Sequence, residues 1–175
     1  MENNTEKVSI KDVSVKWGLI LGVISIALFI IGAVTETSQE SWSQWLGLIP
    51  TIIIFVMAHK QFKEEGDGFM SFGQGTKIGL FVTIISSVIS TLFFYIYISF
   101  VDNTFVENIR EKSLVDMQER GMSDEQIEQA MGMTETFTSP AMLAIFGILA
   151  AVFFGFILSL IVSAFTKNSN PELEV

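Results

Sequence analysis

The chain has 175 residues and a mean hydropathy of +0.52, and only 17% of its residues are charged, against roughly 25% in soluble domains. Half of the residues are hydrophobic and none is cysteine, which excludes disulfides, thiolate metal sites and a catalytic thiol. The net charge of −9 argues against nucleic acid as a partner, because nucleic-acid binding needs a basic surface. The composition indicates an integral membrane protein, with the lipid bilayer as its first partner.

Four long apolar runs without an ionisable residue in their interiors predict four transmembrane helices. They cover residues 17–34, 42–58, 78–101 and 141–165. At 1.5 Å per residue these runs extend about 27, 26, 36 and 38 Å, and the hydrocarbon core of a bilayer is about 30 Å thick. The second run is the weakest, since it contains Gln44 and Pro50, and Pro50 is expected to kink the helix. Three spans are the alternative.

The positions of the lysines predict the orientation in the membrane. With four spans, both termini share one side with the loop 59–77, and these segments hold Lys7, Lys11, Lys16, Lys60, Lys63, Lys77 and Lys167. The short loop 35–41 on the other side holds no lysine or arginine. Both termini are therefore expected to be cytoplasmic. The predicted organisation is a tail (1–16), three transmembrane helices (17–101), an extracytoplasmic hairpin (102–139), a fourth transmembrane helix (140–166) and a second tail (167–175).

A small residue at every fourth position marks one face of the third run and one face of the fourth. The two ridges are Gly75, Gly79, Thr83, Ser87, Thr91 and Gly147, Ala151, Gly155, Ser159, Ser163. We expect these ridges to pack the third helix against the fourth within one chain. A homodimer face and no special role are the alternatives. The first run has only Gly18 and Gly22, for which no special role is expected.

The loop 102–139 carries the signals of two helices. Residues 103–120 have a broken apolar face and an Asp116–Arg120 pair at i,i+4, and Gly121 follows where a helix end favours positive φ. Ser123 and Gln126 form the S-x-x-Q pattern of a capping box. We therefore predict an all-α integral membrane protein, with four transmembrane helices in an antiparallel bundle and an extracytoplasmic helical hairpin between helices 3 and 4.

Two segments resemble a known family. Phe69-Met70-Ser71-Phe72-Gly73-Gln74-Gly75 opens the third span, and the stretch 119–131 (ERGMSDEQIEQAM) joins the two loop helices. With the lysine-bearing tail before the first span, these segments are similar to the DUF4199 family, small four-helix membrane proteins found mainly in Bacteroidetes. The resemblance covers nearly the whole chain and implies a bacterial inner membrane. It implies no activity and no functional residue, because none is established for the family.

Side chains that could carry chemistry are few. His59 is the only histidine, at the end of the second run, and is expected to be an interfacial residue. The stretch 64–68 (EEGDG) could offer oxygens to a hard cation, but it lacks the ligand spacing of an EF-hand and is expected to be a solvated turn. Lys77 can anchor at the headgroups or attract anionic lipid. We predict no catalytic residue, no cofactor-binding residue, no metal ligand and no cofactor.

Two classes of function remain. The first is a non-enzymatic accessory or assembly protein, with a membrane-protein partner or a homodimer as its complex. The second is a small transporter or channel component for a neutral solute, because the spans hold no ionisable residue to mark an ion path. The hydroxyls that could line such a route are Thr83, Ser86, Ser87, Ser90 and Thr91, although they can instead bond to their own helix carbonyls. An intramembrane enzyme is a distant third.

Overall fold

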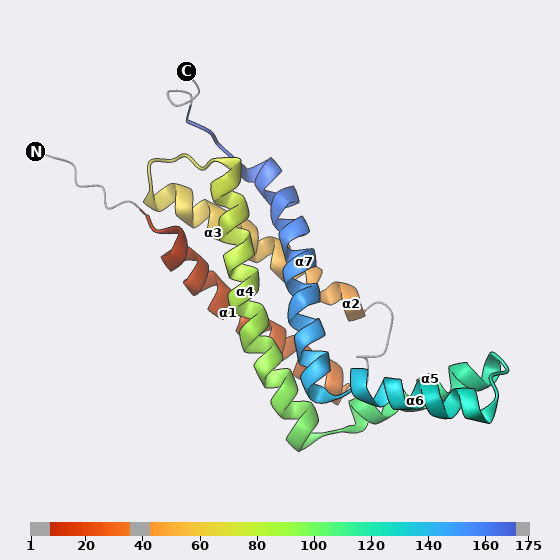
Figure 1. Cartoon of the computed structure of the whole chain (residues 1–175). Coiled ribbons are helices and arrows are strands. Elements are labelled where there is room, and N and C mark those ends of the chain that lie inside the picture. The colour runs from red at the N-terminus through yellow and green to blue at the C-terminus, as the bar shows by residue number, and fades with distance from the viewer. Residues whose placement is uncertain (1–7, 36–42, 171–175) are drawn as a thin grey trace, which may run out of the picture. The chain divides into compact units, whose positions relative to one another are not determined.

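The structure is a computed structural model that describes residues 8–35 and 43–170, apart from the side chains of Ser43 and Gln44. The first seven residues, most of the loop 35–41, Trp42 and the last five residues lie outside the described residues. The described part of the chain is helical (Figure 1). Its elements are α1 (Ile10–Val34), α2 (Ser43–Leu46), α3 (Leu48–Glu65), α4 (Phe72–Ile96), the π-helical turn η2 (Tyr97–Val101), α5 (Thr104–Glu119), α6 (Asp124–Phe137) and α7 (Pro140–Thr166).

Three of these helices are long and apolar enough to cross a membrane. They are α1, α4 together with η2, and α7, with 25, 30 and 27 residues. The second predicted span falls on α2 and α3, and α3 does not join this set because its last turns carry Lys60, Lys63, Glu64 and Glu65. The described residues thus contain three helices of spanning character.

The chain divides into two compact units, and the boundaries fall within α4 and α7. Unit 1 comprises Met1–Ser90 and Ala150–Val175, and unit 2 comprises Thr91–Leu149. In unit 1, α3 contacts both α1 and α2. The buried core of this unit contains Trp17, Leu21, Phe55, Ile78 and Val82. Polar atoms also join α1 to α3, since Trp17 Nε1 and Lys16 Nζ both donate to Gln61 Oε1, at 2.7 and 2.9 Å.

The first helix begins earlier than predicted. Ser9 is its N-cap and accepts from the backbone N–H of Asp12 at 3.4 Å, so residues 10–16 are helical. The extra turns are held by burial, because Val13 is in the core and the Ser14 hydroxyl donates to the Ile78 carbonyl at 3.4 Å. The apolar run alone could not reveal this extension, since charged residues interrupt the pattern there.

The helix break expected from Pro50 is present, and it lies in the turn before this residue. The helix is interrupted at Gly47, between α2 and α3, and Pro50 lies in the first turn of α3. The first N–H groups of a helix have no intrahelical acceptor, so a proline in that turn forfeits no hydrogen bond.

The two ridges of small residues pack on each other within unit 1, as the first interpretation predicted. A Cβ added to Gly75 would lie 2.8 Å from Ser163 Oγ, and one added to Gly79 would meet Ser159. The next pair is Gly155 with Thr83. The α4 and α7 backbones therefore approach closely along this line, and the ridges are occupied inside one chain.

The expectation for Gly18 and Gly22 is wrong. A Cβ on Gly18 would lie 2.8 Å from Ile85 Cβ, and a Cβ on Gly22 would lie 3.2 Å from Ile89 Cβ. The two glycines let α1 approach the β-branched side chains of α4 closely. This single G-x-x-x-G pair therefore allows the close contact between α1 and α4.

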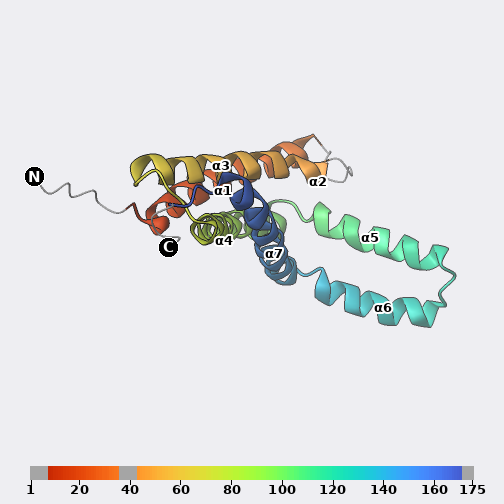
Figure 2. The same cartoon turned by 90° about the horizontal axis from the view of Figure 1, so that it is seen from above.

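In unit 2, α5 and α6 contact each other and lie side by side (Figure 2). Gly121 has φ +71° in the turn between them, and the Ser123–Gln126 capping box is confirmed. The predicted Asp116–Arg120 ion pair is not formed, because within the described residues the structure has one ion pair, Lys60–Glu64 at 3.5 Å. Between the two helices, Arg110 Nε of α5 donates to Oγ1 of Thr138, the C-cap of α6, at 3.1 Å.

Candidate functional site

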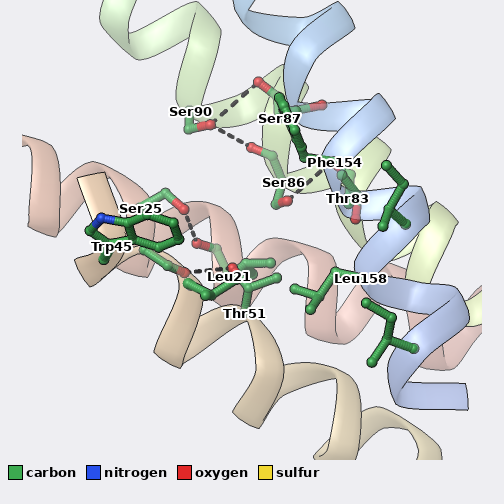
Figure 3. Close-up of a pocket in the computed structure, with 16 residues that line it drawn as sticks. Leu21, Ser25, Trp45, Thr51, Thr83, Ser86, Ser87, Ser90, Phe154 and Leu158 are labelled. Atoms are coloured by element: carbon green, nitrogen blue, oxygen red, sulfur yellow. Dashed lines mark hydrogen bonds between the residues drawn. The ribbon is translucent and has the colours of Figure 1, made fainter.

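A cavity of about 800 Å³ lies within unit 1 (Figure 3). Its wall comes from α1, from α2 and the start of α3, from the middle of α4, and from the second half of α7. It is lined by Leu21, Ser25, Trp45, Gly47, Leu48, Thr51, Thr83, Ser86, Ser87, Ser90, Ala151, Phe154, Gly155, Ile157, Leu158 and Ile161. Pockets that bind small molecules have volumes of about 300–1,000 Å³, so this space is large enough for a ligand.

Four hydroxyl residues of α4 form one side of the cavity. Thr83, Ser86, Ser87 and Ser90 are spaced i, i+3, i+4 and i+7, which places them on one helix face. Thr83, Ser86 and Ser87 are buried. Four of the five hydroxyls that the sequence suggested for a polar route are thus brought together. The fifth, Thr91, belongs to unit 2 and does not line the cavity; its Oγ1 lies 3.9 Å from the Cβ position of Gly147.

Each of these hydroxyls donates to a carbonyl of its own helix. Thr83 bonds to the Gly79 carbonyl at 2.9 Å, Ser86 to the Thr83 carbonyl at 3.0 Å and Ser90 to the Ser86 carbonyl at 2.9 Å. Ser87 makes the same kind of bond at 3.0 Å. The protons are engaged, so these oxygens can act toward a ligand only as hydrogen-bond acceptors.

Two further hydroxyls repeat this arrangement on the other walls. Ser25 of α1 donates to the Leu21 carbonyl at 2.8 Å, and Thr51 of α3 donates to the Gly47 carbonyl at 2.7 Å. The sequence interpretation missed both residues, because their position opposite α4 depends on how the helices pack. Each bond joins a hydroxyl to the carbonyl four residues earlier, however, so a Ser or Thr inside an apolar helical run predicts such a bond from the sequence.

The rest of the wall is apolar and uncharged. None of the described residues that line the cavity is ionisable. Trp45 and Phe154 are 68% and 67% exposed, and Ile161 is half exposed, so the rim is an apolar surface. Three of the helices that form the wall, α1, α4 and α7, are long and apolar enough to span a membrane.

His59, which the sequence led us to expect at the membrane interface, lies in a second polar cluster of unit 1. Its side chain is fully buried. Nε2 lies 2.9 Å from the Gly75 carbonyl, which can only accept, so Nε2 carries a proton. Nδ1 lies 2.7 Å from Thr166 Oγ1, and that hydroxyl also lies 2.8 Å from the Val162 carbonyl.

The Thr166 hydroxyl can serve either protonation state of His59. It can donate to a neutral Nδ1, or it can accept from a protonated Nδ1 and donate to the Val162 carbonyl. The sequence interpretation could not place His59, because its partners lie on α4 and α7.

Backbone bonds close the same end of unit 1. Met70 and Asn168 form an antiparallel β-bridge, with N–H to carbonyl distances of 2.8 and 2.9 Å. Asn168 Nδ2 also donates to the Gly68 carbonyl at 3.0 Å, and Lys63 Nζ donates to the Thr166 carbonyl at 3.0 Å. The loop between α3 and α4 is thereby tied to the residues that follow α7.

The stretch 64–68 is part of this end and has structural roles. Glu64 pairs with Lys60, Glu65 accepts from Gln61 at 2.9 Å, and Asp67 accepts from the Phe69 N–H at 3.0 Å. Gly68 has φ +85°, which suits a turn. Lys77 is exposed near the start of α4.

A second capping box starts α4. The Ser71 N–H donates to Gln74 Oε1 at 2.7 Å, and the Gln74 N–H donates to Ser71 Oγ at 3.2 Å. The sequence interpretation recorded these residues only as part of a family-like motif. The S-x-x-Q pattern before an apolar run was available as a signal.

Apolar helices of spanning length around an uncharged cavity define a helical membrane protein. The chain belongs to the DUF4199 family, described as a protein of unknown function, and the match covers residues 16–168. The resemblance seen in the sequence is thereby confirmed over most of the chain. No curated protein and no solved structure matches it.

Proposed function

We propose that the protein crosses the bacterial inner membrane four times, with α2 and α3 as the second span and with both termini in the cytoplasm. The support is the surface of α3. Ile49, Ile53, Val56 and Met57 are exposed and share one face of the helix, while Phe55 and Ala58 are buried on another. A helix that is apolar on both faces fits lipid better than water.

The absence of cysteine from the sequence gives this topology a direct test. Single cysteines at Asp12, near the start of α1, and Asp67, in the turn after α3, replace exposed side chains. If α3 crosses the membrane, an impermeant maleimide reaches both positions from the same side, and only after the cells are permeabilised. Labelling of the two positions from opposite sides would show that α3 does not cross.

The role that we propose is that of a non-enzymatic accessory protein whose α5–α6 pair binds a partner on the extracytoplasmic side. The observation that carries this proposal is the exposure of α6, which has no buried residue. Met133 is 64% exposed and Phe137 is 48% exposed, and their i,i+4 spacing places them on one face. Val115 adds an exposed apolar side chain on α5. An apolar face of this kind is suited to a protein contact.

Photo-crosslinking in cells tests this role. A photoreactive amino acid at Met133 samples the exposed face, and the matched control at Met131 sits on the half-buried side of the same helix. A reproducible protein adduct from Met133, with none from Met131, would support the partner role. Adducts only to lipid or within the chain would overturn it.

A second candidate is a route for a neutral solute. The specific observation in its favour is the row of hydroxyl oxygens from Thr83 to Ser90 along the cavity. Solute-specific flux into liposomes that contain the purified protein would support this candidate. Flux that equals that of protein-free liposomes for a panel of small polyols and amides would count against it.

A further inference from the structure

We propose that the cavity of unit 1 binds a neutral lipid whose polar end is a hydroxyl group, and that this lipid enters sideways from the bilayer. The site is separate from the α5–α6 surface, and the proposal does not depend on a protein partner. Three properties of the described wall carry it: its charge, the direction of its hydrogen bonds and the position of its rim.

The wall excludes charged ligands. None of the described lining residues is ionisable, so an anionic or cationic headgroup inside the cavity would have no counter-charge. Burying an unpaired charge in a low-dielectric site is far more costly than burying a hydroxyl. The ligand class is therefore neutral.

The hydrogen bonds of the wall set the polarity of the ligand. The hydroxyl protons of Ser25, Thr51, Thr83, Ser86, Ser87 and Ser90 all point to carbonyls of their own helices. A ligand ether or ketone oxygen could accept from these hydroxyls only if an existing bond were broken. A ligand hydroxyl meets oxygens that accept without any rearrangement, so the wall favours a donor.

The depth of the site fits a lipid rather than a water-soluble molecule. Ser86 and Ser87 lie near the middle of the spanning segment Phe72–Val101. The rim residues Trp45, Phe154 and Ile161 are exposed and apolar. A long hydrocarbon chain can lie along this rim while its terminal hydroxyl reaches the α4 oxygens. Figure 3 shows Trp45 and Phe154 on different walls of the same cavity.

The test uses three probes that differ only at one end. They are a hexadecyl chain with a mid-chain diazirine that ends in a hydroxyl, in a methyl ether or in a sulfate. The full-length protein is held in phosphatidylcholine nanodiscs, irradiated with each probe and mapped by mass spectrometry. We expect saturable labelling of the lining segments of α4 and α7 by the alcohol. The ether should need about five- to tenfold more probe, which corresponds to one lost hydrogen bond, and the sulfate should not saturate.

A double variant tests whether the α4 hydroxyl oxygens cause the preference for the alcohol over the ether. In the double variant Ser86→Ala, Ser90→Ala, the alcohol should lose part of its advantage over the ether, because two of the six acceptor oxygens are removed, while labelling by the ether should stay unchanged. Thr76→Val is the matched control, because Thr76 also donates within α4, to the Phe72 carbonyl at 2.9 Å, but does not line the cavity. This control should keep the preference of the wild-type protein.

The comparison of probes on the wild-type protein stands even if a variant does not fold. Equal labelling by alcohol and ether would overturn the proposal, because the cavity would then be a groove for hydrocarbon alone. Saturable labelling by the sulfate would also overturn it. Labelling that maps outside the lining segments would place the bound lipid elsewhere and refute the assignment of this site.

Discussion

The contact between Gly155 of α7 and Thr83 of α4 predicts a large effect for a single added methyl group. In Gly155→Ala, the new Cβ would lie 2.9 Å from Thr83 Cβ and still closer to Thr83 Cγ2 and Oγ1. Thr83 cannot easily rotate away, because it is β-branched and its hydroxyl bonds to the Gly79 carbonyl. The backbones of the two helices must therefore move apart.

The size of the effect follows from the distances. Carbon atoms in contact lie about 3.5–4.0 Å apart, so the 2.9 Å distance to Thr83 Cβ alone requires the helices to separate by at least about 0.6–1.1 Å at this point. Overpacking of this kind costs about 1–3 kcal/mol. At about 2–4 °C per kcal/mol for a chain of this size, Tm should fall by about 2–12 °C.

The matched control lies on the same ridge of the same helix. A Cβ on Gly147 would have Thr91 Oγ1 as its nearest neighbour, at 3.9 Å, which is ordinary contact. Gly147→Ala should therefore leave Tm unchanged or raise it, since alanine is the better helix former by up to about 1 kcal/mol. Thermal unfolding of both full-length variants in one detergent is the assay. Equal Tm shifts for the two variants would refute the packing argument.

Two other changes test parts of the fold outside the spans. Ser71→Ala removes one bond of the second capping box and should cost about 0.5–2 kcal/mol; an unchanged Tm would contradict that role. Gly121→Ala should lower the free energy of unfolding by about 1–2 kcal/mol, because Gly121 has a positive φ. Gly132→Ala should raise the free energy of unfolding, because an added Cβ at this helical position meets no neighbour within 4 Å. Denaturant unfolding that ranks the two variants in the opposite order would contradict these roles.

Local signals in the sequence predicted local structure well. The Ser123–Gln126 capping box, the left-handed Gly121 and the back-bonded hydroxyls of α4 all depend on residues within four positions of one another. The pairing of the two ridges was also predictable, because small residues at i,i+4 spacing invite close approach in lipid.

Features that depend on a third element were not predictable. The burial of His59 was not predictable, because its partners, Gly75 and Thr166, come from two other helices. Gly18 and Gly22 gave no signal beyond a short motif, and their importance comes from the isoleucines that α4 places against them. The second span remained ambiguous for another reason: α3 is apolar in its first half and charged in its second.

The Met70–Asn168 bridge fixes a register between α4 and α7 that the two ridges leave ambiguous. Small residues recur every four positions on both α4 and α7, so a slide of one helix past the other by a full turn would again set small residues against small residues. The observed pairs, Gly75 with Ser163 and Gly79 with Ser159, are therefore one of several nearly equivalent alignments. The bridge belongs to the same alignment, since its two residue numbers have the same sum as those of each ridge pair. Its two backbone hydrogen bonds can form only in that alignment. A single β-bridge next to the helix ends therefore selects the register of α7 along the axis of α4.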